Sequence, residues 1–149
     1  MLFRSDGGMV VIAANSAAQL MGSVIKNTGR ISTSSMVNNG GIIEILADTV
    51  QNLGTIVANA KGNTGNGGQI SIKGNQITLA DTSKIKANAK EQGNGGQIIV
   101  LSNKKTEVSG SIEAKGGKTS VNGGFIETSS KETLTISGAT KVKIGRAHV

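Results

Sequence analysis

Short runs of alternating hydrophobic and polar residues recur along the chain, and each run follows a pair of glycines. The second and fourth residues after each glycine pair are Val10/Ile12, Ile43/Ile45, Ile70/Ile72, Ile98/Val100 and Ile126/Thr128. A period of two is typical of a β-strand that buries one of its faces. We therefore expect these positions to point inward from a set of equivalent strands.

The glycine pairs belong to a repeated tripeptide, Asn-Gly-Gly or Asp-Gly-Gly. Its five copies begin at Asp6, Asn39, Asn66, Asn94 and Asn122, so their first glycines are 33, 27, 28 and 28 residues apart. Recurrence at such a period indicates stacked supersecondary units. Within the third unit, turn residues separate strands that we expect at 68–73, 76–80 and 84–89. The pattern predicts an all-β parallel β-helix, a solenoid of about five coils with three short strands in each.

Stacked coils would place equivalent residues about 4.8 Å apart along the solenoid axis. The repeated tripeptides would then share one corner, where we expect a structural role for their second glycines and four of their asparagines: Gly8, Gly41, Gly68, Gly96, Gly124, Asn39, Asn66, Asn94 and Asn122. Asparagine and glycine tolerate a positive φ in turns, and stacked amides can bond to the next coil. Ion or phosphate binding is the weaker interpretation, because no helix is expected after the glycines to supply a dipole.

The composition agrees with a narrow solenoid. The 149 residues include 22 glycines but no proline, cysteine, tryptophan or tyrosine. Proline would interrupt the ladders between strands, and a thin core of stacked aliphatic side chains needs no aromatic residues. The lack of cysteine excludes a disulfide scaffold and a thiolate metal site. No stretch reaches the roughly 20 apolar residues of a transmembrane helix, so we expect a chain that does not span a membrane.

The two ends of the chain look foreign to this repeat. Residues 1–5 and 144–149 resemble translations of a common sequencing adapter read in opposite senses, and we interpret them as non-native. The alternative is that they are native residues that extend the first and last strands. On the first interpretation a single solenoid segment covers residues 6–143, cut from a longer gene, and the only histidine, His148, lies outside it.

Residues suited to catalysis are sparse. Residues 6–143 contain no histidine or cysteine for nucleophilic or general-base work. Glu44 and Glu127 hold equivalent positions three coils apart, about 14 Å at the strand spacing, whereas glycosidases need two carboxyl groups roughly 5–9.5 Å apart. We therefore expect no catalytic residues, no cofactor and no metal site, and a protein that is not an enzyme.

The chain is basic, with a formal net charge of +7. The lysines have no interleaved aromatic residues for base stacking, so we expect no nucleic-acid partner. They fit a solvated face that opposes edge-to-edge aggregation, or weak attraction to anionic glycans. Aligning the expected third strands at Ile56, Ile85, Ile112 and Val142 places Glu113 between Lys86 and Lys143. We expect an exposed carboxylate there that offsets repulsion in a column of lysines.

Several segments resemble one protein family. Residues 122–130, Asn-Gly-Gly-Phe-Ile-Glu-Thr-Ser-Ser, followed by Leu134-Thr135-Ile136, are similar to the Gly-Gly-Phe-Val-Glu-Thr-Ser segment of filamentous-haemagglutinin-type exoproteins. Residues 27–31 and 52–56 resemble that family's Asn-x-Gly-x-Ile element. The likeness covers essentially all of residues 6–143 and leans toward high-molecular-weight adhesins and haemopexin-binding relatives. The family's amino-terminal secretion domain carries an Asn-Pro-Asn-Gly motif, which this proline-free chain lacks.

The resemblance implies a right-handed parallel β-helix that is exported unfolded by two-partner secretion. The expected function is that of a rod segment in a secreted adhesin or haemagglutinin at the cell surface of a Gram-negative bacterium. The implied partners are an outer-membrane two-partner-secretion transporter, acting on the parent protein, and glycans or proteins of host or bacterial surfaces. The alternatives are a haem- or haemopexin-binding exoprotein on the same rod and, third, a β-helical polysaccharide-active enzyme.

Overall fold

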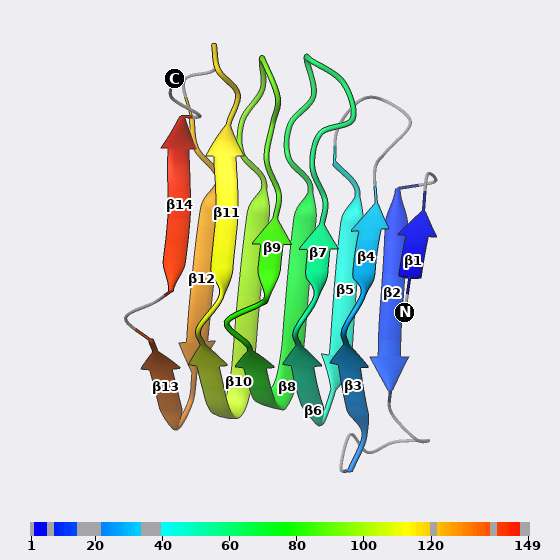
Figure 1. The fold of residues 1–149 in the computed structure, drawn as a ribbon, viewed down its shortest axis with the longest axis vertical. Coiled ribbons are helices and arrows are strands. Elements are labelled where there is room, and N and C mark those ends of the chain that lie inside the picture. Colours follow the sequence, from blue (N-terminus) through cyan, green and yellow to red (C-terminus); the bar gives the residue numbers. More distant parts are fainter. Residues whose placement is uncertain are drawn as a thin grey trace.

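The computed structural model describes residues 2–5, 8–14, 22–33, 40–119, 122–137 and 140–146. All regular elements in these ranges are β-strands, and all of their pairings are parallel. Equivalent strands recur once per turn, and four turns separate the five levels of the solenoid. Successive coils lie side by side from the N-terminal to the C-terminal end (Figure 1). The predicted parallel β-helix is confirmed.

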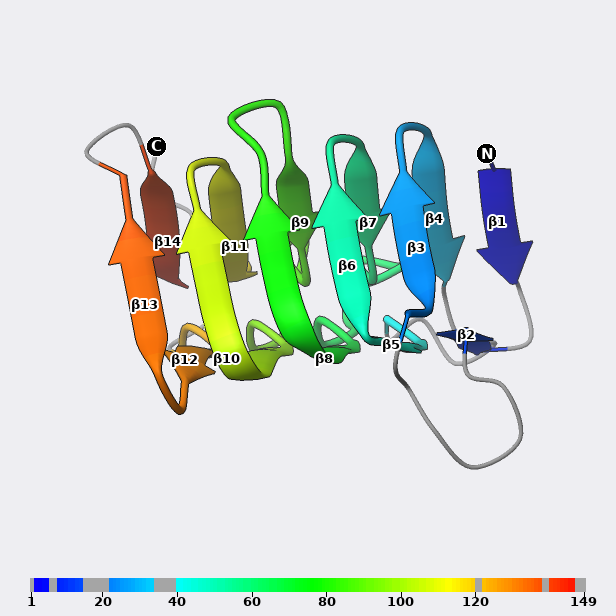
Figure 2. The ribbon, with the colours of Figure 1, turned by 90° about the horizontal axis from the view of Figure 1, so that it is seen from below.

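Three columns of strands form the sides of the solenoid (Figure 2). The first column contains β2 (Met9–Ala14), β5 (Ile42–Ala47), the first parts of β8 (Gln69–Leu79) and β10 (Gln97–Val108), and β12 (Phe125–Ser130). The second column contains β3 (Val24–Asn27), β6 (Thr49–Asn52), the remaining parts of β8 and β10, and β13 (Thr133–Ile136). The third column contains β4 (Arg30–Thr33), β7 (Thr55–Val57), β9 (Lys84–Lys86), β11 (Ser111–Gly116) and β14 (Lys141–Arg146), and β1 (Leu2–Ser5) pairs with β4.

Three corners connect these columns. The first corner joins the first and second columns, the second corner joins the second and third, and the third corner leads to the next coil. At the first corner the strands predicted at 68–73 and 76–80 form one strand, β8, which pairs with β5 before Gly74 and with β6 after Asn75. The strand predicted at 84–89 ends at Lys86, although hydrogen bonds between coils continue to the backbone N–H of Ala89.

The core consists of aliphatic side chains stacked in register. Val10, Ile43, Ile70, Ile98 and Ile126 form one row across the first column. Ile12, Ile45, Ile72, Val100 and Thr128 form the next inward row. Both rows are buried in the middle coils, while Ile12, Ile126 and Thr128 in the terminal coils are half-buried. The predicted inward columns are confirmed, and their burial increases where another coil covers each side.

The last coil leaves its inward side chains partly uncovered. Leu134, Ile136, Val142 and Ile144 are between 42% and 55% exposed. Their register partners in the preceding coil, Thr106, Val108, Ile112 and Ala114, are all buried. Inward side chains of the preceding coil are covered by equivalent residues on both sides. Inward side chains of the last coil are covered on one side only. This apolar surface is one that a further coil of the same cross-section would cover.

The described parts of the two chain ends extend the third column. Leu2–Ser5 pairs with Arg30–Thr33, and residues 144–146 pair with residues 114–116. The open edge of a sheet offers main-chain donors and acceptors to any extended segment. The pairing therefore gives no information about the origin of these residues, and their adapter origin stays a prediction.

Replacing Ile70 by aspartate tests the core. Ile70 is 1% exposed and stacks between Ile43 and Ile98, so Ile70→Asp would bury a carboxylate without a partner. We expect unfolding of the neighbouring coils and a loss of about 3–5 kcal/mol in the free energy of unfolding. Ser71→Asp is the matched control, because Ser71 follows on the outer face of the same strand. Similar chemical-denaturation midpoints for the two variants would contradict the inward assignment of Ile70.

Candidate functional site

The glycine pairs at the third corner are required by close packing of the backbone. A Cβ atom built at Gly68, Gly96 or Gly124 would overlap the carbonyl oxygen of the equivalent glycine one coil earlier. A Cβ at Gly67 or Gly95 would overlap the carbonyl of Ala87 or Ala114. Among the described glycines, positive φ angles occur only at Gly8, Gly22 and Gly93. The sequence-based explanation by positive φ therefore holds for Gly8 but is wrong for Gly41, Gly68, Gly96 and Gly124.

Besides this crowding between coils, a backbone hydrogen bond brings the chain close to itself within each of three successive coils. The N–H of Gly68 donates to the carbonyl of Ala58, and Gly96 and Gly124 donate in the same way to Ala87 and Ala114. These bonds close the base of the loop that leads from the third column to the next first column. The chain thus passes close to its own backbone at every third corner, where only glycine fits.

The asparagines of the repeat lie at the same corner. Asn66, Asn94 and Asn122 are exposed in successive coils, and Asn39 lies outside the described residues. The side-chain oxygen of Asn66 accepts a hydrogen bond of 2.8 Å from the backbone N–H of Asn94. This bond joins the side-chain amide of Asn66 to the backbone of the next coil. The structural role of the full set of four asparagines stays a prediction.

A buried amide ladder runs along the second corner, and sequence reasoning missed it. The amide of Asn27 donates to the Asn52 side-chain oxygen at 2.8 Å, and the Asn52 amide donates to the Ser83 hydroxyl at 2.6 Å. All three side chains are buried. Asn27 and Asn52 are the first residues of the Asn-x-Gly-x-Ile element, so a search for asparagines at equal offsets before the third strand would have found them.

Another ladder follows the first corner. The amide of Asn103 donates to Asn75 at 2.9 Å, and the Asn75 amide donates to the carboxylate of Asp48 at 2.7 Å. The backbone N–H of Gly22 donates to the other carboxylate oxygen of Asp48. The hydrogen bond from the Asn75 amide, followed by that from the Gly22 N–H, lowers the pKa of Asp48. Burial opposes this shift, and the charge of Lys104 adds the smallest lowering effect.

Glu113 forms the densest charge cluster on the third column. It lies in register between Lys86 and Lys143, as predicted. The prediction of an exposed carboxylate is wrong, because only 11% of the Glu113 side chain is exposed. Its carboxylate accepts a hydrogen bond of 3.1 Å from Asn88 and lies 3.6 Å and 3.8 Å from the ammonium groups of Lys115 and Lys143.

These contacts determine the ionisation of Glu113. Burial raises the pKa of this carboxyl group. The hydrogen bond from the Asn88 amide and the charges of Lys115, Lys86 and Lys143 lower the pKa, and their combined effect is larger than that of burial. The net result is a pKa below the ordinary value of 4.5. Glu113 is therefore ionised at neutral pH and stabilises a region that would otherwise concentrate positive charge.

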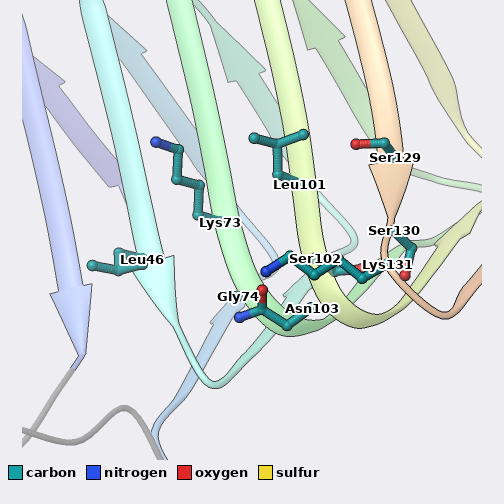
Figure 3. A pocket seen from close by; sticks show the side chains of 9 residues that line it. All are labelled: Leu46, Lys73, Gly74, Leu101, Ser102, Asn103, Ser129, Ser130 and Lys131. Atoms are coloured by element: carbon teal, nitrogen blue, oxygen red, sulfur yellow. The ribbon is translucent and has the colours of Figure 1, made fainter.

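A hollow of about 400 Å³ lies at the first corner (Figure 3). Leu46, Lys73, Leu101 and Ser129 stand in register on four neighbouring strands along its side. Gly74 and Ser102, which are small, continue its surface toward the corner. The hollow combines aliphatic side chains with serine hydroxyls and the amines of Lys73 and Lys131. Every buried side-chain nitrogen or oxygen in the described residues has a hydrogen-bond partner, so no unsatisfied polar group marks the hollow as a ligand site.

The two glutamates at equivalent positions of the first column are too far apart to act together as a glycosidase pair. Glu44 and Glu127 lie in one outward row, separated by Ser71 and Ile99, which corresponds to about 14 Å. The described residues also contain no group of three or more histidine, cysteine, aspartate or glutamate side chains that could hold a metal ion. Nor do they include a helix with the length and apolarity needed to cross a membrane.

Substitutions at Gly96 distinguish close packing from a requirement for positive φ. Gly96→Ala and Gly96→Asn should both lower the free energy of unfolding, by about 1–3 kcal/mol, because either Cβ meets the backbone of Gly67 and Gly68. Gln97→Ala, at the exposed neighbouring position, is the control. Asparagine adopts positive φ readily, so a Gly96→Asn variant as stable as the unchanged chain in thermal denaturation would contradict the packing explanation.

The contribution of Glu113 should depend on pH. Because its folded-state pKa is lowered, the ionised group stabilises the fold above about pH 4.5, and this stabilisation is lost as the pH falls through the folded-state pKa. Glu113→Gln should therefore lower the free energy of unfolding by about 1 kcal/mol at pH 7, with the difference from the unchanged chain vanishing in acid. Urea denaturation as a function of pH measures this, with Glu44→Gln on the exposed outer face as control. A difference that persists unchanged at pH 2 would show that charge is not the cause.

Comparison with known proteins adds no assignment to this geometry. No protein-family model matches the chain, and a search of curated proteins finds no match to it. The resemblance to filamentous-haemagglutinin-type exoproteins therefore depends on the segments quoted above, and the solenoid itself is the firm structural result.

Proposed function

We propose that the chain is a structural rod segment of a secreted bacterial adhesin or haemagglutinin, exported by two-partner secretion to the surface of a Gram-negative bacterium. The observation that carries this proposal is the regular, in-register stacking of coils with one cross-section. Stacking of this kind adds length without changing the sides of the structure. It suits a protein that holds binding regions away from a cell surface.

The contacts of the solenoid also suit export before folding. Each strand pairs with the equivalent strands of the adjacent coils, one repeat away in the sequence. In such structures a folded unit provides the template for the next, so that folding can propagate from one end. The sequence has no cysteines, so it needs no oxidative folding after export. A chain that emerges gradually from an outer-membrane pore could therefore fold coil by coil outside the cell.

The partners follow from this proposal. The transporter would act on the parent protein, and the partners of the adhesin would be glycans or proteins of host or bacterial surfaces. The haemopexin-binding alternative uses the same rod, and no contact among the described residues favours it. The side chains of the third corner and the hollow at the first corner are compatible with a scaffold role.

Export of a fusion protein tests the proposal. The chain would be placed behind the amino-terminal secretion domain of a two-partner-secretion protein and co-expressed with its transporter. We expect a product outside the cell that resists protease, because the solenoid folds after translocation. The Ile70→Asp variant should be exported equally but digested rapidly, since export precedes folding. Retention of the fusion inside cells that export the secretion domain alone would contradict the proposal.

A further inference from the structure

The Asn-Gly dipeptides of the third corner are candidates for spontaneous deamidation. They are Asn39-Gly40, Asn66-Gly67, Asn94-Gly95 and Asn122-Gly123. In such a dipeptide the backbone nitrogen of glycine can attack the side-chain carbonyl carbon of the preceding asparagine, because glycine has no side chain that hinders the approach. The asparagine then loses its amide nitrogen as ammonia. Asn39 lies outside the described residues, so the comparison concerns the other three asparagines.

Solvent exposure does not distinguish these three dipeptides. Asn66, Asn94 and Asn122 are all exposed, and the glycine that follows each of them is half-buried. All three dipeptides also belong to the same motif, Asn-Gly-Gly followed directly by a strand of the first column. A difference in their reactivity in the folded chain therefore has to come from hydrogen bonding.

Stacking engages the backbone nitrogen of the glycine in the earlier coils. The N–H groups of Gly40, Gly67 and Gly95 donate to the backbone carbonyl of the asparagine one coil later, at 2.7, 2.9 and 3.3 Å. The attacking nitrogen must give up this proton and turn toward the asparagine side chain, so the hydrogen bond has to break first. Attack by Gly67 or Gly95 therefore requires a local opening of the corner, as amide hydrogen exchange does.

Asn122 and Gly123 lie at the start of the last described coil. The strand that follows them, β12, pairs with β10 and with no strand on its other side among the described residues. Within the same part of the chain, the N–H of Gly123 has no backbone acceptor. Asn66 is the most constrained of the three asparagines, since its side-chain oxygen also accepts a hydrogen bond of 2.8 Å from the N–H of Asn94.

We propose that Asn122 is the site at which the folded chain deamidates, whereas stacking protects Asn94 and Asn66. The backbone nitrogen of Gly123 forms a bond to Cγ of Asn122, and the bond from Cγ to Nδ2 breaks. Nδ2 leaves as ammonia together with the proton from the Gly123 nitrogen. Water then opens the cyclic imide at either carbonyl, which gives aspartate or isoaspartate. This inference goes beyond the rod function and does not depend on it.

Either product changes the third corner. A carboxylate replaces the neutral amide of Asn122, and isoaspartate also lengthens the main chain at this residue. Gly124 donates its N–H to the carbonyl of Ala114 at 2.7 Å, so a longer main chain disturbs a closely packed backbone. The backbone carbonyl of Asn122 is the acceptor for Gly95. Its displacement makes Asn94 the next asparagine to lose protection.

Peptide mass spectrometry tests the proposal. The folded chain is kept in mildly alkaline buffer, digested with trypsin at intervals and compared with a sample digested at the start. Cleavage after lysine places Asn66, Asn94 and Asn122 in separate peptides, residues 62–73, 91–104 and 119–131. We expect Asn122 to react about fivefold faster than Asn94 or Asn66, or more, because the net contribution of one backbone hydrogen bond corresponds to that factor. Isoaspartate, detected with an isoaspartyl methyltransferase, identifies the cyclic intermediate.

The unfolded chain is the matched control. In concentrated urea no coil covers another, so the three asparagines should react at similar rates. In the folded chain Asn122→Gln should abolish the change in its own peptide, because glutamine has to close a larger ring, and should slow the later reaction of Asn94. Equal rates at the three asparagines of the folded chain, a faster reaction at Asn66 or Asn94, or aspartate without isoaspartate would overturn the proposal. The rod function is unaffected by any of these results.

Discussion

In-register pairing of the backbone between coils is the constraint on which the rest of the structure depends. Parallel strands about 4.8 Å apart place each side chain directly on its equivalent one turn earlier. Ile43, Ile70 and Ile98 can therefore share one buried row although they are 27 and 28 residues apart in the sequence. A change in the length of one turn is tolerated only where the strands that follow return to register, as Lys105 and Gln76 do after the wider first corner.

The same constraint explains the chemistry of the corners. Asparagine can donate to one neighbouring coil and accept from the other, so equivalent asparagines can bond to one another along the axis. Asp48 differs because a carboxylate only accepts, and it receives bonds from Gly22 on one side and Asn75 on the other. At the third corner the backbone itself is the close neighbour. Glycine is needed there because a Cβ would meet a carbonyl oxygen.

In-register stacking is unfavourable where equivalent positions carry the same charge, because the side chains then repel one another. In the third column, a residue of opposite charge reduces this repulsion. Lys86 and Lys143 would lie near each other across a neutral residue, but Glu113 stands between them. Asn88 and Lys115 complete its surroundings and cover the carboxylate. Lys84 and Lys141 have Ser111 between them instead, so their charge remains available. The row through Glu113 is therefore partly neutralised, whereas the row through Ser111 keeps both of its positive charges.

The sequence by itself determined the fold class, the repeat, the inward rows and the register of Glu113, because each follows from residue spacing that recurs once per coil. It could not give the burial of Glu113, since that depends on Asn88 and Lys115 lying against the carboxylate. It also could not show why Gly68 and Gly96 are glycines, because the atoms that exclude a side chain belong to the preceding coil. The buried bond between Asn27 and Asn52 likewise exists only once neighbouring coils are stacked. Local spacing fixes which residues are equivalent, and contacts between coils decide what each of them does.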